Sequence, residues 1–273
     1  MEDKTLIQIL GLEIHRGNRL IISDLDFDLV EGELVTLVGS NGCGKTTLLE
    51  SSAGMNTISS GSIFWKHDSS GMVLVRDSEG RRNPLPPMGL TLQKNGMSGE
   101  ETVQERLMTV LKVSGCEFDD IKISELLDCW GLKHRSSDRI SQLSGGLARR
   151  LSVLSGLAPA LLSKNPRVVL LDEPSEGLDK SAKLLLINWL RSLISRGHGI
   201  ILATHDSDLI SVADRTLTFT DDKKIIFNSK SQPESDFTIP SFTNNISIKK
   251  TSSLFNWAYR MEKRNPIDTI NRL

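Results

Sequence analysis

The sequence lacks the features that mark export, membrane spanning and disulfide scaffolds. Its longest apolar stretches, such as Val168 to Leu171, have the length of a strand, far below the roughly 18 residues of a transmembrane helix. The three cysteines are an odd number without a C-x-x-C pair, which excludes a disulfide framework and a simple zinc site. The apolar stretch Leu6 to Leu12 is too short for a signal peptide. We therefore expect a protein of the reducing cytoplasm whose membrane spans, if any are needed, come from another chain.

The chain also lacks an excess of charge of either sign. With 33 basic and 34 acidic side chains, its formal net charge is −1, so no global field attracts nucleic acid or an anionic membrane. Any anion is therefore expected to bind at a local site. The length of 273 residues allows one large α/β domain or two small ones.

Short runs rich in β-branched residues predict a buried parallel sheet. These runs are Leu34 to Val38, Val168 to Leu171 and Ile200 to Ala203. Helical patterns lie between the first two, at Thr102 to Val113, Ile123 to Trp130 and Leu147 to Leu162. We therefore predict an α/β domain with a helical lobe inserted at about residues 97–162, and a hairpin and loop over Lys66 to Met88.

The last part of the chain turns polar. Ser229 to Pro240 has the composition of a tether, and Ser253 to Arg264 recovers helical spacing in an amphipathic, partly basic segment. Two interpretations of this helix stay open: packing on its own domain or a twin subunit, and contact with a membrane partner. We predict one domain over residues 1–228 and an appendage over residues 229–273.

A phosphate-binding loop stands between a predicted strand and an apolar segment. Residues 39–46 read Gly-Ser-Asn-Gly-Cys-Gly-Lys-Thr and fit G-x-x-x-x-G-K-[ST]. Glycines let backbone N–H groups turn inward around phosphate oxygens. Lys45 is expected to reach the β- and γ-phosphates, and the Thr46 hydroxyl is expected to ligate Mg²⁺. The flanking strand and helix disfavour the alternative, an ordinary glycine-rich turn.

The predicted strand at Val168 to Leu171 ends in two consecutive carboxylates, Asp172 and Glu173. Neighbouring residues of a strand point to opposite sides, so the two acids have different tasks. Beside a phosphate loop, Asp172 would hold Mg²⁺ and Glu173 would polarise the attacking water. An isolated strand with this ending would be a plain boundary before a turn.

A second anion site is predicted at the start of the last helical pattern. Ser144, Gly145 and Gly146 stand at or near that helix N-terminus, where backbone N–H groups are available. Alone, such a sequence is usually a helix cap. With one phosphate loop per chain, it makes best sense as completing the nucleotide site of a neighbouring chain.

The order of these motifs resembles one family. From about Leu6 to Phe219 the chain resembles the nucleotide-binding domain of ATP-binding-cassette (ABC) proteins. The matching marks are the phosphate loop, Gln93, Leu143 to Gly146, the Asp172–Glu173 pair, Gly177-Leu178-Asp179 and Thr204-His205-Asp206. The resemblance implies an α/β fold with a P-loop NTPase core, an N-terminal antiparallel β part and an inserted α-helical subdomain. It also implies an ATPase that binds MgATP between two copies.

The resemblance assigns roles to matching residues. Gln93 would touch Mg²⁺ and the attacking water, His205 would contact the γ-phosphate, and Asp179 would contact the opposing subunit's phosphate loop. Taken singly, each of the three has an ordinary structural explanation. Gln93 would be a loop amide, His205 a residue at a strand end, and Asp179 a helix cap. The complete set of predicted site residues is Glu173, His205 and Gln93 for catalysis; Gly39, Ser40, Asn41, Gly42, Cys43, Gly44, Lys45, Thr46, Thr47, Arg16, Ser144, Gly145, Gly146 and Asp179 for the nucleotide; and Thr46, Gln93 and Asp172 for the metal.

Three features depart from the family pattern. Leu147 stands where glutamine is most common, and the residues after Phe219 match nothing in the family. Arg16 or His15 stands where an aromatic side chain normally stacks on adenine. Arg16 could stack through its guanidinium plane.

The resemblance implies the motor subunit of a transporter, located on the cytoplasmic face of a membrane, with ATP and Mg²⁺ as cofactors. Its expected partners are a second copy or a related cassette, and an integral membrane permease subunit. No nucleic acid partner is expected. The alternative is a soluble non-transport member, such as a cluster-assembly ATPase, which is also a single cassette. A faint similarity to haem-exporter ATPases suggests a haem-exporter-like system. The cargo itself is expected to be chosen by the membrane subunits, and not by this chain.

Overall fold

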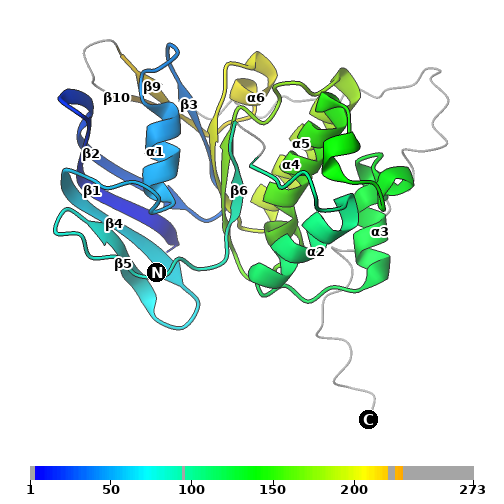
Figure 1. Ribbon diagram of the computed structural model, residues 1–273. Helices are drawn as coiled ribbons and strands as arrows, with labels where there is room; N and C mark the ends of the chain where they lie inside the picture. Colours follow the sequence, from blue (N-terminus) through cyan, green and yellow to red (C-terminus); the bar gives the residue numbers. More distant parts are fainter. Residues whose placement is uncertain (1–3, 94–95, 221–224, 230–273) are drawn as a thin grey trace, which may run out of the picture. The chain divides into compact units, whose positions relative to one another are not determined.

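The computed structural model describes residues 4–93, 96–220 and 225–229 (Figure 1). The chain divides into two units, Met1–Lys230 and Ser231–Leu273, and all described residues belong to the first. The predicted C-terminal helix lies outside the described residues, as does the predicted tether apart from Ser229.

The N-terminal strands form an antiparallel sheet, as predicted. Its order is β2-β1-β4-β5, with β1 at Thr5–Arg16, β2 at Arg19–Val30, β4 at Ser60–His67 and β5 at Gly71–Asp77. Alternate residues of β1, among them Ile7 and Ile9, are fully buried, because successive side chains of a strand face opposite sides. The indole of Trp65 donates to the carbonyl of Ser52 at 2.9 Å and ties this sheet to the first helix. Strands β4 and β5 pair as a hairpin that begins at Ser60, six residues before the predicted one.

The second sheet is mostly parallel and has the order β10-β9-β3-β8-β7-β6. Its strands are β3 at Leu34–Val38, β6 at Gly89–Thr91, β7 at Val168–Asp172, β8 at Gly199–Ala203, β9 at Arg215–Phe219 and β10 at Ile225–Ser229. The three predicted strands match β3, β7 and β8 to within one residue. Every residue of β7 and β8 is buried, as expected for strands covered on both faces. Strands β6 and β9 and the antiparallel edge strand β10 were not predicted.

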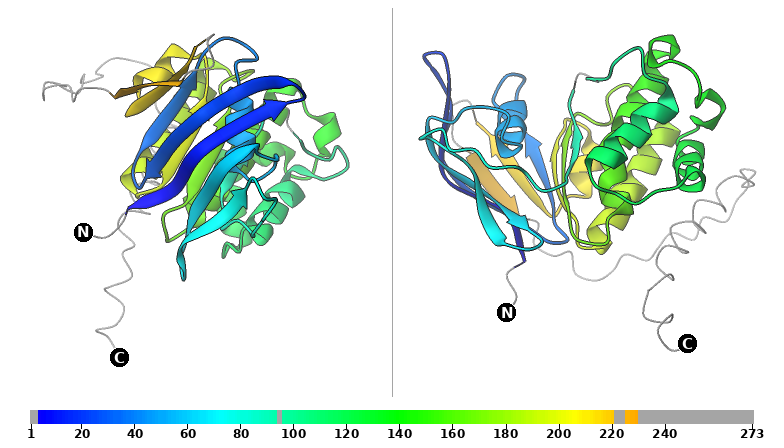
Figure 2. Two further views of the ribbon diagram at one scale, coloured as in Figure 1. Left: turned by 90° about the vertical axis from the view of Figure 1, so that its left-hand side faces the viewer. Right: turned by 60° about the horizontal axis from the view of Figure 1, so that its bottom comes forward.

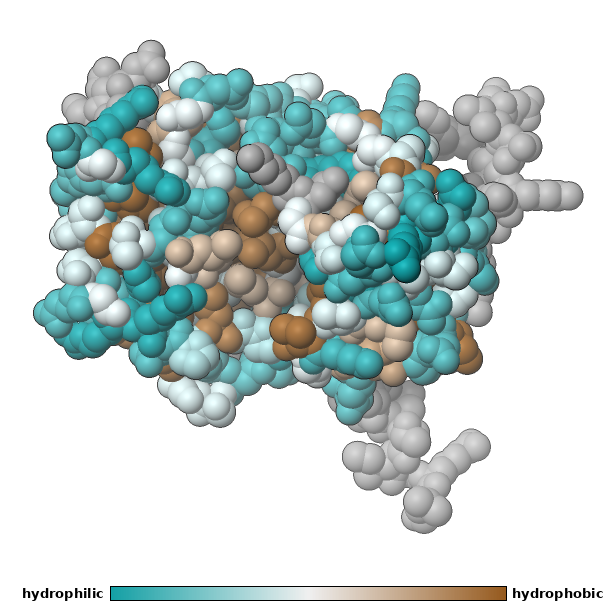
Figure 3. Space-filling view, viewed as in Figure 1, coloured by the Kyte–Doolittle hydropathy of each residue, from teal (hydrophilic) through white to brown (hydrophobic). Residues whose placement is uncertain are grey.

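The helices cover the parallel sheet and form the predicted lobe (Figures 1 and 2). They are α1 at Lys45–Ser52, α2 at Val103–Val113, α3 at Asp120–Cys129, α4 at Gly145–Leu162, α5 at Lys180–Ser195 and α6 at Ser207–Ser211, with short 3₁₀ turns at Lys133–Arg135 and Ile140–Gln142. Thr102 and Glu105 form a capping box that starts α2. Among the described residues, no helix combines the length and the apolar composition needed to cross a membrane. On the face shown in Figure 3, polar residues cover most of the surface and apolar residues gather near its middle.

Two glycines let α4 lie directly on β6. A Cβ atom placed on Gly156 would lie 1.9 Å from the Thr91 hydroxyl oxygen, and one placed on Gly89 would lie 2.2 Å from the Gly156 carbonyl oxygen. Neither position has room for a methyl group. The close approach sets the distance between α4, which Ser144 caps, and the sheet whose strand β7 leads into the two acidic residues.

We expect Gly156→Ala to destabilise the protein by about 2–3 kcal/mol, because overpacking displaces helix or strand. Alanine in a helix interior is otherwise favoured over glycine by about 1 kcal/mol, so a loss of stability is diagnostic. Urea unfolding measures the effect. Gly145→Ala in the same helix is the control, because nothing lies within 4 Å of its added Cβ. Equal stability of the Gly156 variant and the wild type would contradict the close approach.

His198 is buried beside the start of β8. Its Nδ1 accepts a hydrogen bond from the backbone N–H of Arg167 at 2.9 Å. Burial, and then the guanidinium groups of Arg196 and Arg167, lower the pKa of His198 to about 4. The ordinary value is 6.5, so the unfolded chain binds a proton at a higher pH than the folded protein does.

We expect His198 to make stability depend on pH. Its contribution is complete above pH 6.5 and is lost as the pH falls to about 4, by up to about 3 kcal/mol. His198→Asn keeps a hydrogen-bond acceptor that does not titrate. Urea unfolding between pH 4.5 and 7.5 should show the wild type losing stability relative to this variant as the pH falls. Parallel stability curves would contradict the expectation.

Candidate active site

The candidate site lies at the carboxyl edge of the parallel sheet. Strand β3 leads into the phosphate loop, β7 into Glu173, and β8 into Thr204 and His205. Because β8 pairs with both β3 and β7, the three loops are neighbours. The contact between Thr46 and Asp172 thus joins residues 126 positions apart.

The phosphate loop has a backbone that requires glycine. Gly39, Gly42 and Gly44 have φ angles of 150°, 75° and 124°, in the region that other residues rarely adopt. A Cβ atom on Gly39 would lie 2.9 Å from the sulfur of Cys43, a buried side chain, and 2.9 Å from Phe219. At Gly42 nothing lies within 4 Å of such an atom. The loop is therefore packed at its base and open at Gly42, which fits a cradle for an anion.

Lys45 is held against this loop. Its ammonium group donates to the carbonyl oxygens of Gly39 at 2.7 Å and Ser40 at 3.2 Å, and it lies 3.3 Å from Nε2 of His205. Thr47, also predicted in the site, is half-buried in the first turn of α1. The ammonium group can therefore exchange backbone carbonyls for phosphate oxygens without leaving the loop.

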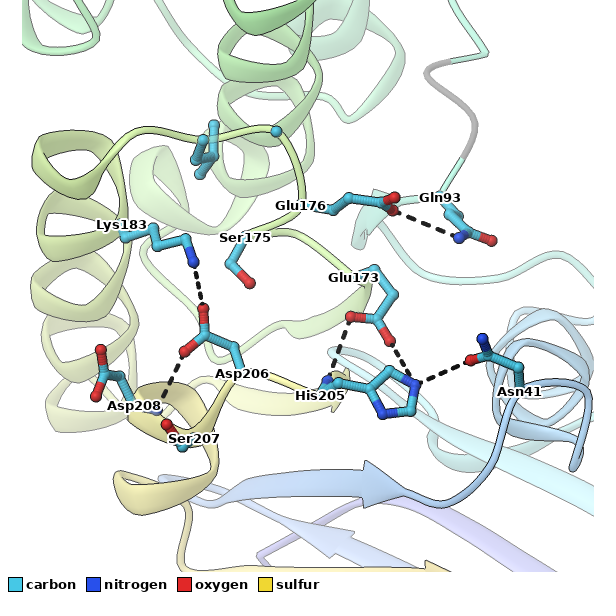
Figure 4. A pocket seen from close by; sticks show the side chains of 12 residues that line it. Asn41, Gln93, Glu173, Ser175, Glu176, Lys183, His205, Asp206, Ser207 and Asp208 are labelled. Carbon is cyan, nitrogen blue, oxygen red and sulfur yellow. Dashed lines mark hydrogen bonds and ion pairs between the residues drawn. The ribbon is translucent and has the colours of Figure 1, made fainter.

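His205 links the phosphate loop to the acidic strand end (Figure 4). Its Nε2 lies 3.2 Å from Oδ1 of Asn41 and 3.4 Å from Oε1 of Glu173. The backbone N–H of His205 also donates to Oε2 of Glu173 at 3.3 Å. The structure thus brings Lys45, His205 and Glu173, predicted from three separate motifs, into one cluster.

The two acidic residues have different partners. Oδ2 of the buried Asp172 accepts from the Thr46 hydroxyl at 2.8 Å, whereas Glu173 faces His205. Burial raises the pKa of both carboxyl groups, against the opposing effects of the Thr46 hydrogen bond and of His205. Glu173 has a φ of 46°, a left-handed conformation that costs a non-glycine residue roughly 1–2 kcal/mol. The neighbouring structure must hold this conformation in place.

Asp172 and Thr46 together fit a Mg²⁺ ion. A hydroxyl and a carboxylate are hard oxygen ligands, and Mg²⁺ takes few protein ligands beside phosphates and waters. Gln93, the third predicted metal ligand, instead turns its amide nitrogen toward Oε2 of Glu176 at 3.4 Å (Figure 4). Gln93 and Glu173 nevertheless line the same cleft of about 680 Å³.

The predicted second anion site begins α4. Oγ of Ser144 accepts from the backbone N–H of Leu147 at 3.4 Å, and Ser144, Gly145 and Gly146 are exposed. Among the residues that the structure describes, this turn does not line the cleft with Glu173. Its exposed backbone is open to a ligand or to another chain.

Asp179 serves as the N-cap of α5 within the chain. Its carboxylate accepts from the backbone N–H of Ala182 at 2.8 Å and the Ser181 hydroxyl at 2.7 Å, and it pairs with Arg150. The two hydrogen bonds from Ala182 and Ser181, more than Arg150, lower the pKa of Asp179 to about 2. Its expected contact with a second copy stays a prediction.

Arg16 pairs with Glu50 of α1, with 2.9 Å between Nη2 and Oε2. The alternative residue, His15, lies beside Ser59 and Glu13. The pair with Glu50 keeps Arg16 next to the helix that follows the phosphate loop, while stacking on a base stays a prediction.

Two residues of this region were missed by sequence reasoning. Glu176 contacts Gln93, and the buried Arg149 of α4 donates to the carbonyls of Asp172 and Glu173. The only local signals were an acid three residues after Glu173 and an arginine pair after the glycines. Neither signal shows that Glu176 contacts Gln93 or that Arg149 is buried.

Comparison with known proteins shows to which family the chain belongs. The ABC transporter family model matches residues 22–176, which include the phosphate loop and the acidic strand end. The chain belongs to the ABC transporter family. It is 34% identical over 203 residues to Nod factor export ATP-binding protein I of Rhizobium leguminosarum bv. viciae, which covers 73% of this chain and 61% of that protein. This ABC chain thus spans about three-fifths of the Nod factor relative.

Other relatives are matched over more of their length. Aliphatic sulfonates import ATP-binding protein SsuB 2 of Paraburkholderia xenovorans (strain LB400) is 35% identical over 77% of this chain and 75% of its own. Lipoprotein-releasing system ATP-binding protein LolD of Bacteroides fragilis (strain YCH46) is 30% identical over 79% of this chain and 98% of its own.

Two solved structures share the fold of this ABC cassette. An ATP-binding subunit of an ABC transporter has a TM-score of 0.69 at 21% identity and covers 83% of this chain and 90% of its own. A bacterial ABC transporter cassette, solved as a dimer, has a TM-score of 0.68 at 19% identity and covers 82% of this chain and 98% of its own. The predicted fold class is confirmed.

We expect Lys45→Ala to weaken MgATP binding at least about tenfold, because the ammonium group would form charge-assisted hydrogen bonds with phosphate oxygens. Isothermal titration calorimetry measures the affinity. Lys183→Ala is the control: this lysine lines the cleft and donates to Asp206 at 2.8 Å, and its loss should change the affinity less than about twofold. Equal effects of the two variants would contradict the role of Lys45.

Proposed function

We propose that this cassette binds MgATP between two copies of itself, hydrolyses it, and drives a separate membrane subunit. ATP-binding subunits of the ABC family are ATPases, which supports the activity. The observation that carries the proposal is the cluster in which the Lys45 ammonium group and the Glu173 carboxylate both contact the His205 imidazole.

Binding would start at the phosphate loop. Its backbone N–H groups and the start of α1 would surround the phosphates, and Lys45 would contact the β- and γ-phosphates. Thr46 and Asp172 would hold Mg²⁺, which supplies positive charge to the phosphate oxygens when it is bound. Arg16 would lie against the adenine base of the nucleotide.

Hydrolysis would use Glu173 as the general base. A carboxylate whose pKa is raised by burial takes a proton from water more readily than an exposed one does. His205 would contact the γ-phosphate while its N–H keeps Glu173 oriented. The Gln93 amide, which lines the same cleft, would orient the water.

The second half of each nucleotide site would come from another chain. The exposed turn of Ser144, Gly145 and Gly146 presents a helix N-terminus suited to phosphate. We therefore propose a head-to-tail homodimer, or a pair with a related cassette, in which Asp179 lies near the partner's phosphate loop. The similar cassette solved as a dimer supports this arrangement.

We further propose a position on the cytoplasmic face of a membrane, bound to an integral permease subunit. The relatives are named for Nod factor export, sulfonate import and lipoprotein release, which favours transport over the cluster-assembly alternative. Because these names differ in cargo and direction, we expect the membrane subunit to choose the cargo. The similarity to haem exporters stays a prediction.

We expect Glu173→Gln to bind MgATP but to lower the hydrolysis rate at least about a hundredfold, because the amide keeps the shape and cannot take the proton. The trapped nucleotide should then shift the variant from monomer to dimer. Light scattering on a sizing column, with and without MgATP, measures the mass, and phosphate release measures the rate.

The double variant Lys45→Ala, Glu173→Gln is the control and should stay a monomer with MgATP. Hydrolysis by Glu173→Gln at the wild-type rate would show that the base is another group. A monomer that binds MgATP but never dimerises would contradict assembly of two copies by nucleotide alone.

A further inference from the structure

Arg149 lies in the first turns of α4, and its buried guanidinium group contacts the ends of two strands. Nη1 donates to the carbonyl oxygens of Leu92 at 3.0 Å and Gln93 at 3.2 Å. Nη2 donates to the carbonyl oxygens of Asp172 at 3.0 Å and Glu173 at 2.6 Å. One side chain thus joins the segments that carry Gln93 and Glu173.

The stem of the same side chain packs on the loop that leads to Asp179. A Cβ atom placed on Gly177 would lie 3.8 Å from Cγ of Arg149, so the loop backbone lies directly over the stem. Two connections of the candidate site, the one after β6 and the one between β7 and α5, therefore meet at one residue of α4, the helix whose N-terminus is the Ser144 turn.

The contacts explain how the unusual backbone of Glu173 is held. Glu173 has a φ of 46°, and Nη2 of Arg149 binds the carbonyls of both Asp172 and Glu173. Rotation about the Glu173 backbone would break at least one of these bonds. The fixed backbone in turn directs the carboxylate to the N–H of His205.

A buried guanidinium group requires compensation. Burial lowers the pKa of Arg149, and the carboxylates of Glu176, Asp172 and Glu173 act in the opposite direction. Arginine stays charged in proteins, so these acids and the four carbonyls together hold the cation in place.

We propose that Arg149 is a positioning residue for hydrolysis, which holds Gln93 and Glu173 in one unit with the Ser144 turn. This inference rests on the proposed function. A contact at the Ser144 turn would reach Glu173 through a single helix and a single side chain.

Arg196 offers a matched comparison. Its guanidinium group is also partly buried and donates to two carbonyl oxygens, of Leu161 at 2.9 Å and Ser163 at 2.8 Å. These carbonyls lie at the other end of α4, away from the phosphate loop. Loss of either arginine removes charge-assisted hydrogen bonds to backbone, but only the loss of Arg149 frees Glu173.

The experiment compares Arg149→Ala and Arg196→Ala in steady-state hydrolysis and MgATP binding. We expect Arg149→Ala to lower kcat about a hundredfold while the Kd for MgATP changes less than about threefold. Arg196→Ala should keep kcat within about twofold of the wild type. Millimolar guanidinium ion should restore part of the kcat of Arg149→Ala, whereas the same concentration of urea should not.

Arg149→Lys keeps the charge without the planar fork and should give an intermediate kcat, which serves if the alanine variant does not fold. Wild-type kcat in a folded Arg149 variant, or equal losses in the two alanine variants, would overturn the inference. Glu173→Gln separates the two hypotheses. If it is inactive while a folded Arg149 variant has wild-type kcat, only the role of Arg149 fails; if it is fully active, the assignment of the base fails first.

Discussion

The pairing of three buried parallel strands, β3, β8 and β7, is the constraint on which the site depends. Every residue of β7 and β8 is buried on a sheet covered on both faces, so a slip of register would draw the polar residues at the strand ends into the core. Because the strands run in one direction, the loops that follow them open at one edge. Lys45, Glu173 and His205 meet there although no two of them are close in sequence. The hydrophobic core thus fixes where the charged groups lie.

Gathering these charges at one edge requires that they satisfy one another before a nucleotide arrives. Lys45 donates to two backbone carbonyls, Thr46 to Asp172, and Arg149 to four carbonyls. Under the proposed function, phosphate oxygens replace the backbone carbonyls that Lys45 contacts. The loop glycines and the Arg149 contacts stay in place, so little rearrangement is needed and little binding energy is lost to ordering.

Most of the site could be predicted because its signals are local: apolar runs for β3, β7 and β8, glycine spacing for the loop, and paired acids after a strand. Helices α3 and α4 begin two or three residues before the predicted starts, because Asp119 and Ser144 cap them ahead of the apolar spacing. Strand β10 was missed since polar residues surround it in the sequence, and among the described strands it pairs only with β9. Arg149 was missed for a different reason. A helical arginine usually faces solvent, and only the close approach of α4 to the sheet buries this one.

That close approach also gives a physical reason for the proposed division of the site between two chains. Gly156 brings α4 against β6, so the helix carries Arg149 into the interior while its N-terminal turn stays exposed five residues earlier. One rigid element therefore has one end available to a partner's phosphate and an inner side chain bound to the chain's own Glu173 backbone. On the proposed function, hydrolysis in one site would then depend on occupancy of the other, because each α4 helix contacts one nucleotide and positions the base for the second.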